Sequence, residues 1–211
     1  MNTELSTVFV IDGENAARAS LSLLLESAGF RTEQHESAEV FLRSFDSTCD
    51  PNDPGCALVD VLLPGISGLE LQARLNAQQV NLPIVFLTRA GDICQCVQAM
   101  KAGAVDFLEK PYQQLRLLTS ISEALARHEH SLHDSLRRET LKQRLAQLTR
   151  REREIMAQLV SGEATISSEQ IAERLHISRR TVEHHRAAIK EKMRAHSLLE
   201  LVDMARVCEF H

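Results

Sequence analysis

The stretch that decides the fold reads Cys56-Ala57-Leu58-Val59-Asp60-Val61-Leu62-Leu63-Pro64-Gly65. Four residues of apolar character lead directly into Asp60, and a Pro-Gly turn follows shortly after it. A continuous apolar run of this kind is typical of a strand buried on both faces, as in a parallel sheet. Asp60 would then lie at the carboxyl end of that strand, where open α/β sheets form their binding crevice. The stretch therefore predicts a functional carboxylate at Asp60.

Four further segments are predicted to be strands, and they span residues 7–11, 30–35, 83–87 and 105–108. Helical patterns separate them, and Gly29 and Gly103 stand just past the ends of two of these helices, where glycine is favoured. Strands that alternate with helices form parallel sheets through right-handed crossovers. We therefore expect residues 1–125 to form an α/β domain with a five-stranded, doubly wound parallel sheet of the flavodoxin-like type.

Polar groups stand where these strands are expected to end. Asp12, Asp60 and Thr88 each follow a predicted strand, and Lys110 comes after the fifth. The carboxyl ends of such strands converge on one crevice. Two carboxylates, a hydroxyl and an ammonium group suit the transfer of a phosphoryl group to a carboxylate, with Mg²⁺ bound by carboxylate oxygens. Each residue alone could be an ordinary strand-end polar group, but the four together favour a phosphoryl-acceptor site.

Residues 5 to about 125 resemble the receiver domain of bacterial two-component response regulators. The residues that carry the resemblance are Asp12, Asp60 with Pro64-Gly65, Thr88, the run Met100-Lys101-Ala102-Gly103-Ala104-Val105-Asp106-Phe107, and Lys110-Pro111. The resemblance implies that Asp60 is the phospho-acceptor, that Thr88 and Phe107 form a switch pair, and that Lys110 senses the phosphate. It also implies a cis peptide bond before Pro111.

Two features depart from the receiver pattern, and both weaken the predicted metal site. The family normally has a second acidic metal ligand directly after Asp12, but this chain has Gly13 there and an acidic Glu14 one position later. Arg89 stands where the family usually has a small residue. We therefore expect only a weak Mg²⁺ site at Asp12 and Asp60, which makes Mg²⁺ a doubtful cofactor. We hypothesise that Arg89 folds toward both carboxylates, and a solvated Arg89 is the alternative.

Residues 113–148 contain neither proline nor glycine and predict one or two long helices. Leu118, Leu125 and Leu132 recur every seven residues, a spacing that permits a short two-helix coiled coil. The alternative is a last receiver helix packed on its own sheet and followed by a solvated stretch. We assign residues 126–147 to a helical linker between two domains.

Residues 148–211 show the signals of four short helices. Capping-box patterns begin at Thr149 and Ser167, and Ser178 is expected to cap a third helix. Residues 174–194 contain seven basic residues against two acidic ones, although the whole chain has a net charge of −5. Such a patch indicates a polyanionic partner, and a solvated helix face is the alternative. Two short helices joined by a brief turn, the second basic, are typical of a helix-turn-helix.

The same segment resembles the DNA-binding domain of the NarL/FixJ (LuxR-type) regulators, and the order of the domains matches the FixJ branch. The matching residues are Leu148-Thr149, Arg151-Glu152, Glu154-Ile155, Ile171-Ala172, Leu175, Ile177-Ser178, Thr181-Val182, His185, Ile189, Lys192-Met193 and Glu200-Leu201-Val202. One departure falls between Gly162 and Ser168, where the loop is longer than usual for the family.

The resemblance implies that base readout comes from the residues just after Val182. These are Glu183, His184 and Ala187; a glutamate can accept a hydrogen bond from cytosine, and a neutral histidine can donate or accept one. We expect phosphate contacts, which position the domain, from Arg179, Arg180, Thr181, Arg186, Lys190 and Lys192. The family uses part of the apolar surface of its last helix, here residues 198–207, for dimerisation. A two-fold dimer would read a palindromic operator.

The chain has no run of about 18 apolar residues that could span a membrane and no recognisable signal peptide, so we expect a cytoplasmic protein without a membrane partner. We predict a DNA-binding transcriptional regulator of a two-component system, with a sensor histidine kinase, an operator and a second copy as partners. The alternative is a phosphorylation-independent regulator whose degenerate receiver is a protein-interaction module. An enzyme acting through Asp60 is disfavoured, because the sequence has no glycine-rich loop to cradle a phosphate.

Overall fold

The structure is a computed structural model of the whole chain, and it describes residues 6–48, 54–89, 93–161, 166–208 and 210. The chain divides into two compact units between Leu132 and His133. Each unit has its own hydrophobic core, formed by aliphatic side chains and a few phenylalanines. In the part of the chain that is described, no helix has both the length and the apolar character that a membrane span requires.

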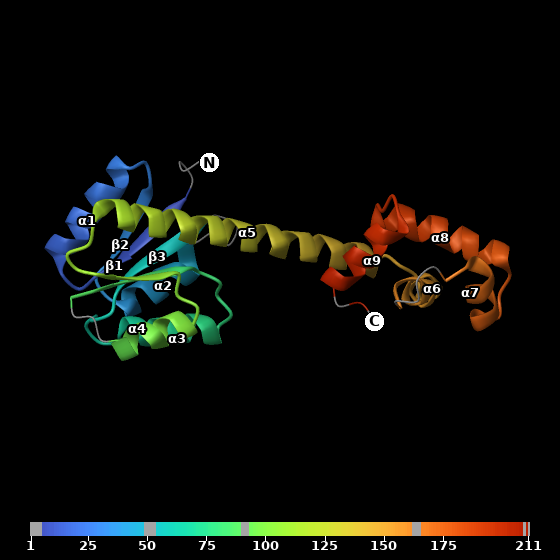
Figure 1. Cartoon of the computed structure of the whole chain (residues 1–211), viewed down its shortest axis with the longest axis horizontal. Helices are drawn as coiled ribbons and strands as arrows, with labels where there is room; N and C mark the ends of the chain where they lie inside the picture. Colours follow the sequence, from blue (N-terminus) through green and yellow to red (C-terminus); the bar gives the residue numbers. More distant parts are fainter. Residues whose placement is uncertain (1–5, 49–53, 90–92, 162–165, 209, 211) are drawn as a thin grey trace. The chain divides into compact units, whose positions relative to one another are not determined.

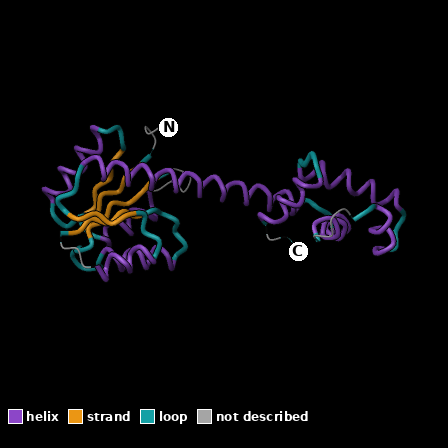
Figure 2. Tube along the Cα trace, in the orientation of Figure 1, coloured by secondary structure: helices purple, strands orange, loops and turns teal. Residues whose placement is uncertain are grey.

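A five-stranded parallel sheet lies at the centre of the N-terminal unit (Figure 2). Its strands are β1 (Thr7–Ile11), β2 (Arg31–His35), β3 (Gly55–Asp60), β4 (Ile84–Thr88) and β5 (Asp106–Glu109). Every residue of β1, β3 and β4 is buried, as the continuous apolar runs predict. The strand order is β2-β1-β3-β4-β5, so the direction of winding reverses between β1 and β3. Doubly wound sheets bind their ligands at this switch point.

Helices cover both faces of this sheet (Figure 1). α1 (Asn15–Ser27) and the first part of α5 (Gln114–Ala146) bury Leu25 and Leu117 against one face. α2 (Ala38–Thr48), α3 (Gly68–Ala77) and α4 (Ile93–Lys101) bury Phe41, Leu71 and Ala99 against the other. The predicted doubly wound α/β fold is therefore confirmed. Gly29 and Gly103 follow α1 and α4 with φ angles of 89° and 96°, which only glycine adopts without strain.

α5 is a single helix of 33 residues. Ile121 and Leu125 are buried against the sheet, which agrees with the alternative of a last helix packed on its own domain over residues 113–125. Leu141 and Leu145 instead belong to the core of the C-terminal unit. The stretch assigned to a linker, residues 126–147, therefore includes core residues near its end. A coiled coil between two copies of α5 stays a prediction, as do the domain boundaries.

Four helices form most of the C-terminal unit: α6 (Arg150–Val160), α7 (Ser168–Leu175), α8 (Arg179–Met193) and α9 (Leu198–Val207). Both predicted capping boxes are present, at Thr149 and at Ser167, and the Ser178 side chain caps α8. α7 ends at Leu175, and the next residue, His176, has a left-handed φ of 52° that turns the chain toward α8. Residues 162–165, where the longer loop is expected, lie outside the described residues.

Candidate functional site

A cavity of about 290 Å³ opens at the carboxyl edge of the sheet. Its lining residues are Asp12, Gly13, Glu14, Asp60, Leu62 and Arg89. The register of β1 and β3 pairs Ile11 with Val59, so Asp12 and Asp60 are the next residues on two neighbouring strands. Both aspartates are buried, with exposed fractions of 3% and 6%. The sheet thus brings two carboxylates together beneath an open cavity.

Lys110 joins the two carboxylates. Its Nζ lies 2.7 Å from Asp12 Oδ2 and 2.6 Å from Asp60 Oδ2. The Lys110 backbone N–H donates to the carbonyl of Thr88, which ties the lysine to the end of β4. The Lys110–Pro111 peptide bond is cis, as the receiver resemblance implies. Burial lowers the pKa of Lys110, but the hydrogen bonds that it donates to Asp12 and Asp60 outweigh burial and raise it. The ammonium group therefore stays charged at neutral pH.

The second oxygen of each carboxylate is held by the backbone. Asp12 Oδ1 accepts the N–H of Glu14 at 2.9 Å, and Asp60 Oδ1 accepts the N–H of Leu62 at 2.8 Å. In both cases the donor is two residues further along the chain, so the turn after each strand fixes the side chain that ends it. One oxygen of each group is thus anchored, and the other faces Lys110.

The predicted switch residues lie on the two strands beyond β3. Thr88 ends β4 and is 1% exposed, and its neighbour Leu87 pairs with Asp60 in the sheet register. Phe107 is half-buried on β5, where its ring centre lies 6.1 Å from that of Phe86. The structure therefore places Thr88 beside the acceptor strand and Phe107 one strand further away.

Arg89 does not behave as we hypothesised. Its guanidinium pairs with the carboxylate of Glu14 at the cavity wall, and 62% of its side chain is exposed. Lys110, and not Arg89, takes the position between Asp12 and Asp60. The hypothesis that Arg89 folds onto both aspartates is therefore wrong for this structure. The reason is that Glu14, one position past the missing ligand, offers Arg89 a carboxylate that no other cation shares in the described structure.

The donor set fits a weakly held Mg²⁺ ion. Mg²⁺ is commonly bound by one or two carboxylates together with waters and phosphate oxygens, and Asp12 and Asp60 supply two carboxylates at one cavity. No group of three or more His, Cys, Asp or Glu side chains within the described ranges could hold a metal. Lys110 already shares both aspartates, and Arg89 holds the nearby Glu14. A cation at Asp12 and Asp60 would therefore compete with Lys110 for both carboxylates, with the positive charge of Arg89 close by.

The loop after Asp60 is held in place by Glu39, a residue that sequence reasoning missed. Glu39 Oε1, on α2, accepts the N–H of Ile66 at 3.0 Å. Hydrogen bonds from its own N–H, from Ile66 and from the Ser37 side chain lower the pKa of Glu39. Pro64 of the same loop lies against Gly13, where an added Cβ would be only 2.9 Å from Pro64 Cδ. The space for a side chain at position 13 is therefore filled by the proline ring.

α8 carries the residues predicted to contact DNA, and one face of it is solvent-exposed. Arg180, Glu183, His184 and Ala187 are all exposed, and their spacing of three and four residues places them on the same side of the helix. This is the face expected to read bases, and Arg180 lies at its N-terminal end.

Several cations of α8 already have partners within the unit. Arg179 pairs with Glu183 at 2.8 Å and with Glu169. Arg186 donates to the Ser168 hydroxyl at 2.9 Å. By contrast, the side chains of Arg180 and Lys190 make no ion pair or hydrogen bond to any residue that the structure describes. These two cations are thus the most readily available for a polyanion.

Lys192 has a structural partner that the sequence did not indicate. Its Nζ donates to both carboxylate oxygens of Glu152, at 2.9 and 2.7 Å. Glu152 is only 5% exposed, and its carboxylate also accepts the Thr149 N–H in the capping box. Burial raises the pKa of Glu152, but the hydrogen bonds from Lys192 and Thr149 outweigh burial and lower it. This pair ties α8 to the start of α6.

Comparisons with known proteins cover both units. Residues 8–122 match the response regulator receiver domain, and residues 146–205 match the bacterial regulatory proteins of the luxR family. The transcriptional regulatory protein FixJ of Azorhizobium caulinodans is 42% identical over 198 residues, which span 94% of this chain and 90% of that protein. The response regulator protein TodT of Pseudomonas putida is 36% identical over 203 residues, which span 96% of this chain and 86% of that protein.

Solved structures agree with this assignment. The response regulator StyR has a TM-score of 0.81 and 37% identity, over 95% of this chain and 98% of that one. Full-length FixJ from B. japonicum has a TM-score of 0.57 and 39% identity, over 97% and 98% of the two chains. Relatives of this kind do not favour the alternative of a phosphorylation-independent interaction module. The chain therefore belongs to the two-component response regulators that combine a receiver domain with a LuxR-type DNA-binding domain.

Proposed function

We propose that phosphorylation of Asp60 by a sensor histidine kinase switches this regulator to a dimer that binds a palindromic operator. The observation that carries the proposal is the buried pair of Asp12 and Asp60, joined by Lys110 at an open cavity. A carboxylate that is anchored on one oxygen and faces an ammonium group with the other is well placed to accept a phosphoryl group. We place this activity in the cytoplasm, where the operator DNA is found.

The chemistry at Asp60 is a simple displacement. The Oδ2 atom attacks the phosphorus of a phosphohistidine, an O–P bond forms, and the P–N bond of the donor breaks while the departing imidazole nitrogen takes up a proton. Lys110 Nζ lies 2.6 Å from this oxygen, so it can follow the charge onto the transferred phosphoryl oxygens. Mg²⁺, held by Asp12 and Asp60, would add further neutralisation of those oxygens when bound.

The switch follows from the neighbouring strands. We infer that the Thr88 hydroxyl moves to a phosphoryl oxygen and that Phe107 then turns from its half-buried position toward the space that Thr88 leaves. Phosphorylation shifts the population only because the phosphoryl group bonds better in one of the two arrangements. The face that responds includes α4, where Ile93, Val97 and Met100 are 79%, 46% and 43% exposed. Exposed apolar residues at helical spacing suit a contact with a second copy.

In the DNA-binding unit, we assign base readout to Glu183, His184 and Ala187 and phosphate contacts to Arg180, Lys190 and Thr181. Arg179, Arg186 and Lys192 reach phosphates only if they give up or share their present partners. Leu199 on α9 is 72% exposed and would contribute to a dimer contact in this unit. A two-fold dimer then reads two half-sites.

The test treats the full chain with acetyl phosphate or beryllium fluoride, with and without Mg²⁺. Mass spectrometry should locate the phosphoryl group on Asp60, and size-exclusion chromatography should show a dimer that binds operator DNA. The Asp60→Asn variant should give neither response. Specific DNA binding by a chain that responds to neither reagent would instead support the phosphorylation-independent alternative.

A further inference from the structure

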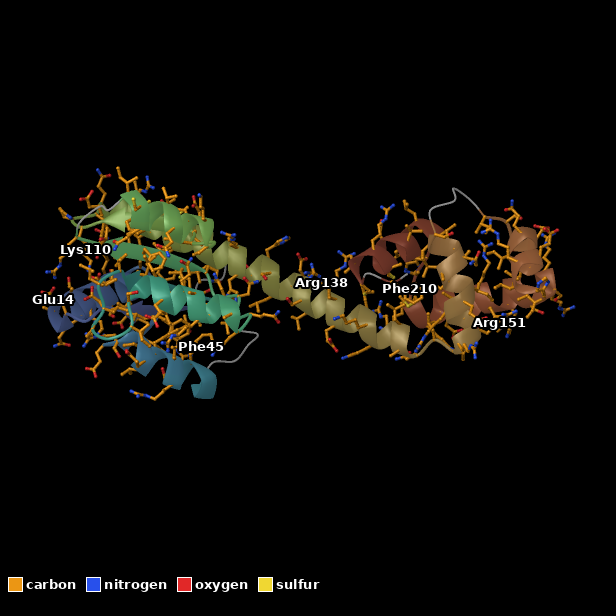
Figure 3. All side chains as sticks on the ribbon, turned by 90° about the horizontal axis from the view of Figure 1, so that it is seen from below. Glu14, Phe45, Lys110, Arg138, Arg151 and Phe210 are labelled. Atoms are coloured by element: carbon orange, nitrogen blue, oxygen red, sulfur yellow. The ribbon has the colours of Figure 1, made fainter. Side chains whose placement is uncertain are left out.

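The ion pair between Arg89 and Glu14 belongs to the acceptor cavity. Both residues line it together with Asp12 and Asp60. Figure 3 shows the side chains of Glu14 and Lys110 at the same end of the N-terminal unit. Arg89 directly follows Thr88, the last residue of β4. Leu87, the residue before Thr88, pairs with Asp60 in the sheet, so the Arg89 backbone lies next to the end of the acceptor strand β3. Arg89 is therefore within the same cavity as the group that is modified.

The pair is held loosely. The side chains of Arg89 and Glu14 are 62% and 51% exposed, and exposed ion pairs gain little because water screens the charges. The Glu14 backbone is nevertheless fixed, since its N–H donates to Asp12 Oδ1. Glu14 can thus release the guanidinium by a side-chain rotation alone, without moving the turn that orients Asp12.

Phosphorylation changes the charge balance of the cavity. Three carboxylates, those of Asp12, Asp60 and Glu14, face the two cations Lys110 and Arg89. A phosphoryl group replaces the single charge of Asp60 with a charge of about −1.5 to −2 and adds three strong acceptor oxygens. Lys110 is shared with Asp12 and can neutralise only part of this charge. Gly13 supplies no carboxylate that would strengthen a bound metal ion.

We propose that Arg89 leaves Glu14 and binds the phosphoryl group on Asp60, and that Glu14 holds Arg89 at the cavity wall until then. A planar guanidinium can donate two parallel hydrogen bonds to phosphoryl oxygens. This contact is stronger than the exposed, solvent-screened ion pair that Arg89 forms with the Glu14 carboxylate. Arg89 therefore supplies part of the positive charge that a tightly bound metal ion would otherwise bring to the phosphoryl group. The inference rests on Asp60 being the acceptor.

The experiment measures beryllium fluoride binding to the full-length protein by ¹⁹F NMR at several Mg²⁺ concentrations. Arg89→Ala should weaken binding about 10-fold or more, the loss expected when a charge-assisted hydrogen bond is removed. Arg89→Lys should fall between the wild type and Arg89→Ala, because an ammonium group cannot form the bidentate contact. The matched control is Arg74→Ala, which breaks a similarly exposed pair with Glu70 on α3, outside the cavity, and should leave binding unchanged.

Glu14→Gln tests the holding role. It should tighten binding by about two- to fivefold, the range that an exposed ion pair allows, and this gain should disappear in the Glu14→Gln/Arg89→Ala double variant. Equal binding by wild type and Arg89→Ala would overturn the proposal, and the same gain from Glu14→Gln with or without Arg89 would overturn the role of Glu14. If the wild type forms no adduct, or Asp60→Asn forms the same one, the proposed acceptor itself is wrong.

Discussion

At the scale of single residues, each unit depends on a buried acid that a lysine neutralises. In the receiver, Lys110 forms ion pairs with Asp12 and Asp60. In the DNA-binding unit, Lys192 forms an ion pair with Glu152. A buried charge without its partner is costly, whereas the pair itself contributes little net stability. Removing either lysine should therefore be costly, because it would leave a buried carboxylate without its cation. The amino-acid composition does not distinguish these two lysines from the other basic residues of the chain.

Replacing Lys192 by methionine should destabilise the C-terminal unit. The change leaves the Glu152 carboxylate buried with only its capping hydrogen bonds, and because Lys192 is partly exposed we expect a loss of about 1–3 kcal/mol. Urea unfolding followed by amide NMR signals of α6 and α8 measures this loss. Lys190→Met on the same helix, a lysine without a described partner, should change stability by less than about 0.5 kcal/mol. Equal effects of the two changes would contradict the structural role of Lys192.

The same pair predicts a pH dependence. The pKa of Glu152 in the folded unit lies below its ordinary value of 4.5, so its contribution to stability is fully present above that value and is lost as pH falls through the lowered folded pKa. The difference in stability between the wild type and Lys192→Met should therefore shrink as the pH falls and Glu152 becomes protonated. Urea midpoints measured between neutral pH and pH 3 give this trend. A difference that grows toward acid pH would show that Glu152 is not the group responsible.

Arg180→Ala should weaken DNA binding by a similar factor for every sequence. Arg180 is exposed and has no described partner, so it is available for a phosphate. Removing one phosphate contact should also reduce the slope of log affinity against log salt by about one. Fluorescence anisotropy with operator and random DNA at several salt concentrations measures both effects. Glu183→Gln provides the contrast, since a loss at selected base positions is expected there.

At the scale of elements, the acceptor cavity depends on the loop between β3 and α3. Glu39 on α2 holds the Ile66 N–H, and the ring of Pro64 fills the space beside Gly13. Helix α2 and the turn after β1, which are far from this loop in the sequence, thus contact it and hold it in place. The loop in turn fixes Leu62, whose N–H holds Asp60.

Glu39→Ala should loosen this loop without unfolding the sheet. The Ile66 N–H loses its acceptor, which corresponds to about 1 kcal/mol, so amide hydrogen exchange at Ile66 should become about fivefold faster or more. Glu70→Ala, at an exposed site on the neighbouring α3, is the control and should leave Ile66 unchanged. Unaltered exchange at Ile66 in Glu39→Ala would show that another group holds the loop.

At the scale of the whole molecule, the proposed switch must connect Asp60 to a second copy of the chain. α4 presents Ile93 at 79% exposure, and α1, on the other face of the sheet, presents Leu23 at 68% (Figure 1). Because both residues are apolar and exposed, each can be replaced without disturbing the hydrophobic cores. Comparing the two replacements therefore shows which face of the receiver forms the dimer contact.

Ile93→Asp should reduce dimerisation in beryllium fluoride while leaving the modification of Asp60 intact. A buried charge in an apolar contact is strongly unfavourable, so the apparent dimer affinity should fall at least about tenfold. Sedimentation velocity measures dimerisation, and ¹⁹F NMR measures adduct formation. Leu23→Asp should leave both unchanged. A dimer that survives Ile93→Asp but is lost in Leu23→Asp would place the contact on α1.

The sequence alone determined the elements and the family. Local patterns were enough to predict the buried strands, the capping boxes at Thr149 and Ser167, and the strand-end residues Asp12 and Asp60. Each of these features depends on residues close by in the sequence and on the periodicity of apolar residues. The convergence of Asp12, Asp60 and Lys110 also followed, because the ends of parallel strands meet at one edge.

Only the tertiary structure decided the partners of individual side chains. Arg89 pairs with Glu14, Lys192 with Glu152 and Glu39 with the Ile66 N–H, and Leu141 and Leu145 of the expected linker belong to the C-terminal core. The physical reason is that charged and polar groups interact over a few ångströms in space, regardless of their separation in sequence. Which carboxylate lies within that distance of a given cation is fixed only when strands, helices and loops have packed together.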